Sequence, residues 1–266
     1  GSSVPFDLNA DGAADLLWQN RADGRLSLWH MSGAAHIFNE PLVPDQVGDT
    51  GWHIVGSADA NGDGYADLYW QHQTSGQLSV WYMRENRLLS GDLLSPSAVP
   101  DTNWRVRSVA DMDRDGHPDL IWQNVSTGLV SVWFMNGRTL RSGDVIGSGP
   151  VTDTQWTIVG TGDMNDDGWT DLVWHHTGGG HLAVWFMYGQ TMLRGESLSP
   201  ASVPDANWRV RGVGDLNVDG TPDLLWQNLS TFDVAVWFMN GLQLIDGRPV
   251  IGPRLPSAAW HLVTPR

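Results

Sequence analysis

The sequence predicts an all-β protein, a five-bladed β-propeller with four antiparallel strands in each blade. Three observations predict this fold class: five repeats with a fixed period of 52 residues, four short strand-like runs in each repeat, and no segment with helical periodicity. The 266 residues include 31 glycines and 16 tryptophans but no cysteine. We therefore expect one folded domain over residues 1–266, and neither a disulfide scaffold nor a disordered chain.

Each repeat is marked by an aspartate-rich segment, Asp-x-(Asn/Asp)-x-Asp-Gly-x-x-Asp, which starts at residues 7, 59, 111, 163 and 215. In the second repeat the β-branched and aromatic runs predict strands over 52–57, 68–71, 77–83 and 88–94. The aspartate segment, a Thr-Ser-Gly turn and a polar turn separate them. Four strands in a repeat of about 50 residues are typical of one propeller blade.

The two ends of the chain share one register. Trp260-His-Leu-Val263 matches the first strand of a repeat, Trp52-His-Ile-Val55, whereas the N-terminus enters just after that position. We expect the C-terminal strand to complete the N-terminal blade and close the ring, which removes free sheet edges. A fragment of a larger ring, or an open array, is the alternative.

The aspartate segments have the pattern of cation-binding loops. They place side-chain oxygens at loop positions 1, 3, 5 and 9, with a carbonyl available at 7 and a glycine for the sharp turn at 6. All-oxygen donors in this spacing favour Ca²⁺ over Mg²⁺ or Zn²⁺, although tryptophan replaces the glutamate that an EF-hand has at position 12. The predicted metal ligands are Asp7, Asn9, Asp11, Asp15, Asp59, Asn61, Asp63, Asp67, Asp111, Asp113, Asp115, Asp119, Asp163, Asn165, Asp167, Asp171, Asp215, Asn217, Asp219 and Asp223.

The charge of these loops supports bound metal. The ligand set contains 16 aspartates, because the third loop has Asp113 where the others have asparagine, and this charge predicts that the third loop is among the tightest. Up to five Ca²⁺ would change the formal charge from -15 to -5 and relieve repulsion between the carboxylates. The alternative is that the loops are Asp/Asn/Gly turns capped by their own side chains, without metal.

The opposite face of the ring is expected to collect repeated polar groups beside tryptophans. Glutamine or histidine ends each second strand, and asparagine or histidine follows it. An aspartate precedes the first-strand tryptophan by three residues in four copies, and Ser257 takes its place in the last. Such groups can bind a sugar, with the polar side chains on its hydroxyls and the indole on the C–H face of the sugar ring. Alternatively, the polar side chains tie the loops between blades to backbone groups. The predicted ligand-binding residues are Gln71, His72, Asp101, Trp104, Gln123, Asn124, Asp153, Trp156, His175, His176, Asp205 and Trp208.

The overall charge excludes some partners. Thirty acidic residues against 15 basic ones, all arginine, argue against nucleic acid, and no apolar run is long enough to span a membrane. The nine histidines and three glutamates form no recognisable acid/base pair at a unique place, so we expect no enzyme activity. We expect a monomer.

The motifs also carry a family resemblance. Asp7-Leu-Asn-Ala-Asp-Gly-Ala-Ala-Asp-Leu-Leu-Trp18, followed in the repeats by a Thr-Gly turn and Val-Trp-Phe-Met-Asn-Gly, resembles the FG-GAP/VCBS-type repeat of secreted bacterial proteins. That repeat is related to the blades of integrin α-subunits and of integrin-like fungal propeller lectins. The resemblance implies Ca²⁺ in the loops between the first and second strands, and a secreted or cell-surface location.

The resemblance does not fix the function. Our first expectation is a secreted, lectin-like propeller that binds carbohydrate multivalently. The alternative is an adhesion, scaffold or accessory propeller that binds protein, and a polysaccharide-active enzyme is the third hypothesis.

Overall fold

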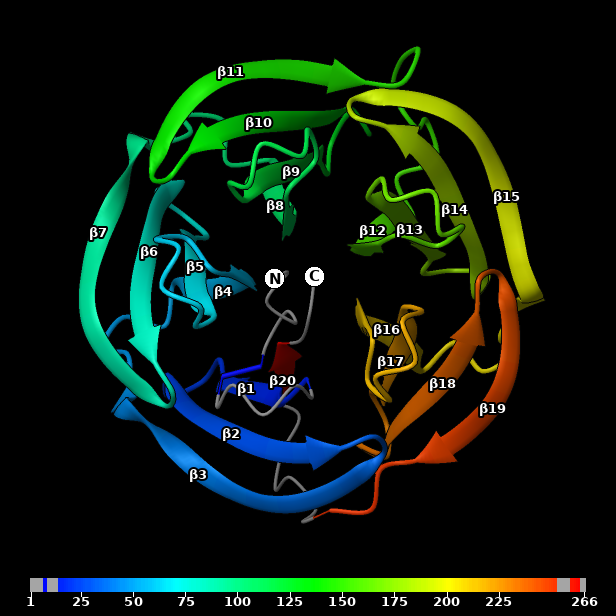
Figure 1. Cartoon of the computed structure of the whole chain (residues 1–266), viewed down its shortest axis with the longest axis horizontal. Helices are drawn as coiled ribbons and strands as arrows, with labels where there is room; N and C mark the ends of the chain where they lie inside the picture. Colours follow the sequence, from blue (N-terminus) through cyan, green and yellow to red (C-terminus); the bar gives the residue numbers. More distant parts are fainter. Residues whose placement is uncertain (1–6, 9–13, 253–258, 264–266) are drawn as a thin grey trace.

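The computed structural model describes residues 7–8, 14–252 and 259–263, and these residues form strands and turns without any helix. Their 20 strands make five four-stranded blades around a central axis (Figure 1). From the axis outwards, blade 1 consists of β20 (Trp260–Val263), β1 (Leu16–Asn20), β2 (Arg25–Ser32) and β3 (Ala35–Gln46). Blade 2 consists of β4 (Trp52–Ala58), β5 (Asp67–His72), β6 (Gln77–Arg84) and β7 (Arg87–Ala98), so the four strands expected in the second repeat are confirmed.

The other three blades repeat this arrangement. Blade 3 consists of β8 (Trp104–Ala110), β9 (Asp119–Asn124), β10 (Val130–Asn136) and β11 (Thr139–Ile146). Blade 4 consists of β12 (Trp156–Gly162), β13 (Asp171–His176), β14 (His181–Tyr188) and β15 (Thr191–Ser202). Blade 5 consists of β16 (Trp208–Gly214), β17 (Asp223–Asn228), β18 (Val234–Asn240) and β19 (Gln243–Pro249). Consecutive strands within each blade are antiparallel.

The ring closes as the sequence predicts. Strand β20 pairs antiparallel with β1, with Leu17 opposite Val263 and Asn20 opposite Trp260. The last described strand of the chain is therefore the innermost strand of blade 1. This pairing gives blade 1 the same four strands as the other blades.

Glycines let the innermost strands approach one another. A Cβ atom on Gly56 would lie 2.4 Å from Cγ2 of Val109, and one on Gly160 would lie 2.7 Å from Cγ2 of Val213. Neither distance is possible for a real side chain, so these positions require glycine for close packing. Strand β4 can thus pack against β8, and β12 against β16.

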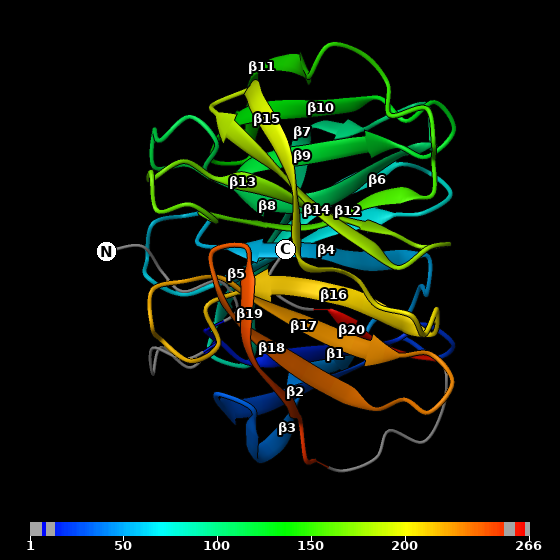
Figure 2. The ribbon, with the colours of Figure 1, turned by 90° about the vertical axis from the view of Figure 1, so that its right-hand side faces the viewer.

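The outer strands form a belt. Single parallel bridges join β3 to β7 at Val43 and Arg87, β7 to β11 at Ser95 and Thr139, and β15 to β19 at Ser199 and Gln243. Figure 2 shows these long strands curving along the rim. Within the described residues no such bridge joins β11 to β15, because β11 has 8 residues where β3, β7 and β15 have 12.

Tryptophans fill the core between blades. The indole of Trp70 in β5 is 2% exposed and packs against Trp81 of β6, with ring centroids 4.6 Å apart. Equivalent pairs recur in all five blades, at 4.6 to 5.0 Å. Large aromatic pairs of this kind contribute more than their buried area alone. These tryptophans are structural.

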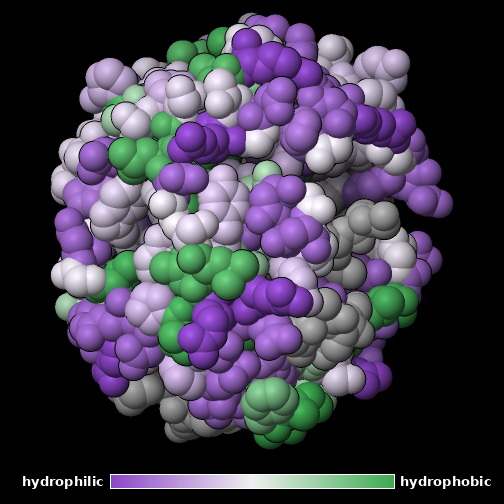
Figure 3. All heavy atoms as spheres, turned by 60° about the vertical axis from the view of Figure 1, so that its left-hand side comes forward, coloured by the Kyte–Doolittle hydropathy of each residue, from purple (hydrophilic) through white to green (hydrophobic). Residues whose placement is uncertain are grey.

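The surface shown in Figure 3 is mainly hydrophilic, and its hydrophobic side chains form small separate patches. In the described part of the chain no helix is long and apolar enough to cross a membrane.

Candidate metal centre and the opposite face

Each aspartate loop connects the innermost strand of a blade to its second strand. In blade 2 the loop starts at Asp59, directly after β4, and ends at Asp67, the first residue of β5. The backbone has positive φ at loop positions 4 and 6, which are Gly62 (77°) and Gly64 (90°). Position 4 keeps this conformation in the third to fifth loops, where it is Arg114 (63°), Asp166 (59°) and Val218 (61°). The four loops therefore share one shape that does not depend on glycine at position 4.

The carboxylate at position 1 organises the turn. Asp59 Oδ1 accepts hydrogen bonds from the backbone N–H groups of Gly62 (2.7 Å) and Asp63 (3.1 Å), and its Oδ2 accepts one from Gly64 (2.8 Å). Asp111, Asp163 and Asp215 accept the equivalent bonds from positions 5 and 6. These are the self-capping contacts of the alternative interpretation, and they also hold the side-chain oxygens in place.

The third loop brings three carboxylates together. Oxygens of Asp111, Asp113 and Asp115 lie within 4.8 Å of one another. An all-oxygen cluster with three negative charges is the donor set that suits a hard cation such as Ca²⁺. In the second, fourth and fifth loops, position 3 is an asparagine whose amide donates to the carboxylate at position 5, as Asn61 does to Asp63 at 3.1 Å.

The aspartate at position 9 lies deeper than the others. Asp67 is fully buried, and its two oxygens accept hydrogen bonds from the backbone N–H groups of Met83 (2.8 Å) and Ala60 (2.9 Å). It thereby fastens the loop to β6. Burial raises the pKa of this carboxyl to about 7. The same contacts, and the same rise of the pKa to about 7, recur at Asp119, Asp171 and Asp223.

A carboxylate oxygen has two lone pairs, so each position-9 oxygen keeps one acceptor site beside its backbone hydrogen bond. The remaining loop, in blade 1, is described only at its ends. Asp15 is buried and accepts a hydrogen bond from the backbone N–H of Met31 at 3.2 Å. The predicted ligands Asn9 and Asp11 lie outside the described residues.

Sequence reasoning missed a cation that belongs to the third loop. The guanidinium of Arg141, on the outer strand β11, donates to the carboxylates of Asp113 and Asp115. The signal was present, because positions 37, 89, 193 and 245 of the other repeats are isoleucine or leucine. Only the pairing of β11 with β10 in the structure reveals that the arginine at position 141 contacts the aspartate loop.

Sequence reasoning also missed a histidine–glutamate pair in blade 1. His30 Nε2 lies 2.8 Å from Glu40 Oε1, and Nδ1 lies 3.4 Å from Asp15 Oδ2. Other repeats have tyrosine or phenylalanine at the position of His30. The imidazole is 4% exposed and stacks on Phe38, with ring centroids 4.2 Å apart. The pair therefore has no counterpart in the other repeats, and it joins a buried imidazole to a Glu40 side chain that is 36% exposed.

On the opposite face, the glutamines at the ends of the second strands connect neighbouring blades. Gln71 is fully buried; its amide donates to the carbonyl of Trp104 (2.9 Å) and accepts from the N–H of Val106 (3.1 Å) in blade 3. Gln123 makes the same two bonds to blade 4. His175 is buried and accepts only one weak bond, from Val210 N–H at 3.5 Å. The structure places these three predicted ligand-binding residues between blades, so the backbone-tying interpretation applies to them.

The other predicted ligand-binding residues do come together, with exposed aspartates beside half-buried or buried partners. In blade 4, Asp153 Oδ2 lies 2.9 Å from His176 Nε2, and the imidazole packs edge-on against Trp156, with ring centroids 5.2 Å apart. Blade 2 has the same set in Asp49, His72 and Trp52. Asparagine replaces histidine in blades 3 and 5, where Asn124 donates to Asp101 (3.1 Å) and Asn228 to Asp205 (3.3 Å). Trp104 and Trp208 are half-buried nearby.

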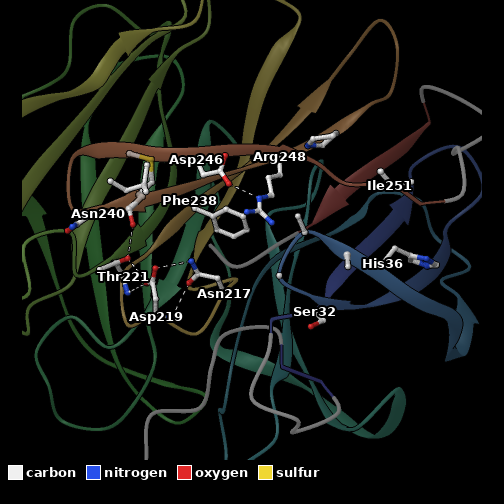
Figure 4. A pocket seen from close by; sticks show the side chains of 16 residues that line it. Ser32, His36, Asn217, Asp219, Thr221, Phe238, Asn240, Asp246, Arg248 and Ile251 are labelled. Atoms are coloured by element: carbon white, nitrogen blue, oxygen red, sulfur yellow. Dashed lines mark hydrogen bonds and ion pairs between the residues drawn. The ribbon is translucent and has the colours of Figure 1, made fainter.

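A large rim cavity of about 950 Å³ lies where blade 5 meets blade 1 (Figure 4). Its wall includes Asn217, Asp219 and Thr221 of the fifth aspartate loop, together with Phe238 and Arg248. A second cavity of about 620 Å³ lies on the ring axis, lined by the position-1 residues Asp59, Asp111, Asp163 and Asp215. Both depend on contacts between blades, which sequence spacing does not reveal.

Comparisons with known proteins identify the repeat. The model of the FG-GAP-like repeat matches residues 7–70, 59–122 and 111–174, which together cover more than half of the chain. No curated protein sequence matches the chain.

Two solved structures align with most of this chain. A mutant Photorhabdus luminescens Tc holotoxin pore is 17% identical, with a TM-score of 0.48, over 94% of this chain and 12% of that chain. The dihydro-heme d1 dehydrogenase NirN in complex with DHE is 12% identical, with a TM-score of 0.39, over 95% of this chain and 47% of that chain. This chain thus spans less than half the length of either.

Proposed function

Because the chain belongs to the FG-GAP-like repeat family, we propose that it is a secreted, calcium-binding β-propeller that binds carbohydrate at repeated sites. One observation carries the carbohydrate proposal: a carboxylate, an imidazole or amide, and a half-buried indole recur together in four blades. The calcium proposal is supported by the clustered carboxylates of Asp111, Asp113 and Asp115.

Calcium would act on the fold rather than on a reaction. The loops would hold it through the oxygens at positions 1, 3 and 5, with position 9 beneath them. Bound Ca²⁺ would neutralise carboxylates that otherwise repel one another. The ion would therefore fix the loops that join the two inner strands of each blade.

The sugar sites would use the groups that remain accessible. The side chains of Asp49 and Asp153 are 66% and 51% exposed, and each already orients a histidine. Carboxylate oxygens accept from sugar hydroxyls, the imidazoles donate, and the indole contacts the C–H face of the sugar. In blades 3 and 5 the buried amides of Asn124 and Asn228 would instead position the carboxylates to which they donate. Four such sites on one face would convert weak single-site binding into avidity on a glycan surface.

The proposal assigns no catalytic residue. His30 and Glu40 form an asymmetric acid/base pair, in which the imidazole is only 4% exposed and the Glu40 side chain is 36% exposed. A second candidate function is protein binding at the rim cavity between blades 5 and 1. Ile245 and Ile251 contribute to its wall and are 64% and 81% exposed, which favours an apolar partner surface there.

A glycan array with and without EDTA tests the proposal, using a variant in which Asp49, Asp101, Asp153 and Asp205 are changed to asparagine. The matched control changes Asp45, Asp92 and Asp144, which are exposed on the outer strands, to asparagine. We expect defined glycans to bind the wild type and the control but not the quadruple variant. Absence of glycan binding by folded wild-type protein would reject the carbohydrate proposal in favour of protein binding.

A further inference from the structure

The arginines of this protein show an unusual distribution of ion pairs. Arginines with side chains 45 to 64% exposed pair with acids; these are Arg25, Arg138, Arg141, Arg194 and Arg248. Arg21 and Arg107 are half-buried, yet neither forms an ion pair with any carboxylate of the described residues. We would expect the half-buried arginines to be the paired ones, because a charge that is removed from water depends more on an opposite charge than an exposed one does.

These arginines gather at one end of the ring axis. The innermost strands all begin there, and their second residues are His53, Arg105, Thr157, Arg209 and His261. Arg107 and Arg211 lie two residues further along β8 and β16, and Arg21 directly follows β1. The seven residues of β8 span about 20 Å, so this basic end is well separated from the acidic axial cavity at the opposite strand ends.

The basic groups lie close enough to affect one another. Burial, and then the charges of Arg21 and Arg105, lower the pKa of His53 to about 4. Burial, and then the charges of Arg21 and Arg209, lower the pKa of Arg211 to about 10. Burial and the charge of Arg105 do the same for Arg107. Arg21 thus influences residues on both of its sides, in blade 2 and in blade 5.

The hydrogen bonds of these groups leave donors for a ligand. Arg107 uses Nε–H to donate to Gln123 Oε1 at 3.2 Å, which leaves its four Nη–H donors. Nε of Arg21 is buried without a hydrogen-bond partner among the described residues. Arg105 donates through one Nη to the carbonyl of Gln73 at 3.2 Å. Several charged donors therefore lie in a partly desolvated region, and none of them forms an ion pair with a carboxylate of the described residues.

We propose that the basic end of the ring axis binds one small anion through charged oxygens, held by Arg21, Arg105 and Arg107. Guanidinium groups suit this ligand class because their planar donors match two oxygens of a sulfate, phosphate or carboxylate. An anion bound here would compensate charges that otherwise destabilise the fold. This site is separate from the aspartate loops, which lie at the opposite ends of the innermost strands.

Calorimetric titration with sulfate tests the proposal, at an ionic strength held constant with sodium chloride. The informative variant is Arg107→Val, since valine occupies the equivalent positions 55, 159 and 263. The matched control is the exposed Arg138→Asn, which introduces the residue found at position 86. We expect about one sulfate per wild-type chain, at least tenfold weaker binding by Arg107→Val, and no change in the control.

Thermal melts supply a second readout. In chloride alone, Arg107→Val should have a higher melting temperature than the wild type, because the variant lacks an uncompensated charge. Addition of sulfate should raise the melting temperature of the wild type by more than it raises that of Arg107→Val. Equal sulfate effects in all three proteins would be a general salt effect and would overturn the proposal. Absence of sulfate binding by the wild type would also overturn it.

Two further arms complete the experiment. Glucuronate in place of sulfate distinguishes a carboxylate ligand from an inorganic oxyanion, since the site should prefer one of them. Arg107→Lys keeps the charge but loses the planar donor pair. This variant replaces Arg107→Val in the titration if the valine variant does not fold. We expect a severalfold loss of sulfate affinity in the lysine variant, and unchanged affinity would contradict the role of Arg107.

Discussion

Arg141 Nη1 donates a hydrogen bond to Asp115 Oδ2 at 2.7 Å, which places a guanidinium from the rim of blade 3 at its aspartate loop. The same guanidinium donates to Asp113 through Nη2. Hydrogen bonding to Asp113 raises the pKa of Arg141. Both positions depart from the repeat together, since the other units have asparagine and an aliphatic residue there. The extra acid and the extra base therefore compensate each other within one blade.

This pairing changes the expected ranking of the loops. By charge alone the third loop would be among the tightest, but Arg141 cancels the charge of Asp113 and competes for its oxygens. We predict that Arg141→Leu, which introduces the residue found at positions 89 and 193, strengthens Ca²⁺ binding at this loop about two- to fivefold.

Chelator-competition titration of Ca²⁺ measures this affinity in wild type and variant. The double variant Arg141→Leu with Asp113→Asn recreates the residues of the second and fourth loops and should bind Ca²⁺ as those loops do. A weaker third site in Arg141→Leu would show that the arginine supports metal binding instead.

Removal of calcium should destabilise the whole ring. A ligand present at 100 times its dissociation constant stabilises the folded state by about 2.7 kcal/mol per site, and as many as five sites contribute. We predict that EDTA lowers the melting temperature by more than about 10 °C. Scanning calorimetry checks this, with restoration by excess Ca²⁺ but only partly by Mg²⁺ as the control. An unchanged melt in EDTA, with no metal found by elemental analysis, would contradict the calcium assignment.

The metal-free protein should become more stable on mild acidification. Asp67, Asp119, Asp171 and Asp223 have a folded-state pKa of about 7 against an ordinary 3.8, so the folded protein binds protons that the unfolded chain releases. Their contribution to stability is complete below pH 4 and is lost as the pH rises through 7.

Histidines oppose this trend. Burial lowers the pKa of His53 and His175 to about 4 and also lowers that of His36, so their contribution is lost as the pH falls from 6.5 towards 4. Because four carboxyls act against these imidazoles, we predict a net gain of about 1 to 3 kcal/mol per pH unit between pH 7 and 5.5. Urea unfolding in EDTA across this range measures it. Stability that falls with acidification in EDTA would show that these carboxyls are ionised in the folded protein.

The sequence was sufficient for the strands, the blade number and the closure of the ring, because each depends on spacing that repeats every 52 residues. Trp260 was placed correctly beside the end of β1 for this reason. Contacts that break the repeat could not be predicted in the same way. Arg141 and Glu40 lie on outer strands, and a register shift next to Met135 and another next to Met31 affect which residues they face.

The polar residues of the opposite face show a different limit. The repeat spacing placed Gln71 and His72 at the same end of the blade, opposite the aspartate loops, but it could not tell which of the two side chains is buried. The structure separates them: Gln71 bridges to blade 3, whereas His72 packs on Trp52 beside Asp49. Adjacent strand residues point to opposite sides, and only the packing of the next blade decides which side is the interior.

The junction between blades 4 and 5 provides a last prediction. At this junction His175 takes the place of the glutamine that makes two hydrogen bonds to the next blade at positions 19, 71 and 123, and its Nε2 is buried without a partner among the described residues. His175→Gln should restore a bond to the Trp208 carbonyl and improve the bond from Val210 N–H. Since a net hydrogen bond contributes about 1 kcal/mol, we predict a stabilisation of about 1 to 2 kcal/mol.

The reciprocal variant Gln71→His should destabilise the protein by a similar amount, because it would leave Trp104 O or Val106 N–H without its hydrogen bond. Urea unfolding of both variants measures the two changes in the presence of Ca²⁺. A loss of stability in His175→Gln would mean that the histidine makes a contact at this junction that glutamine cannot replace.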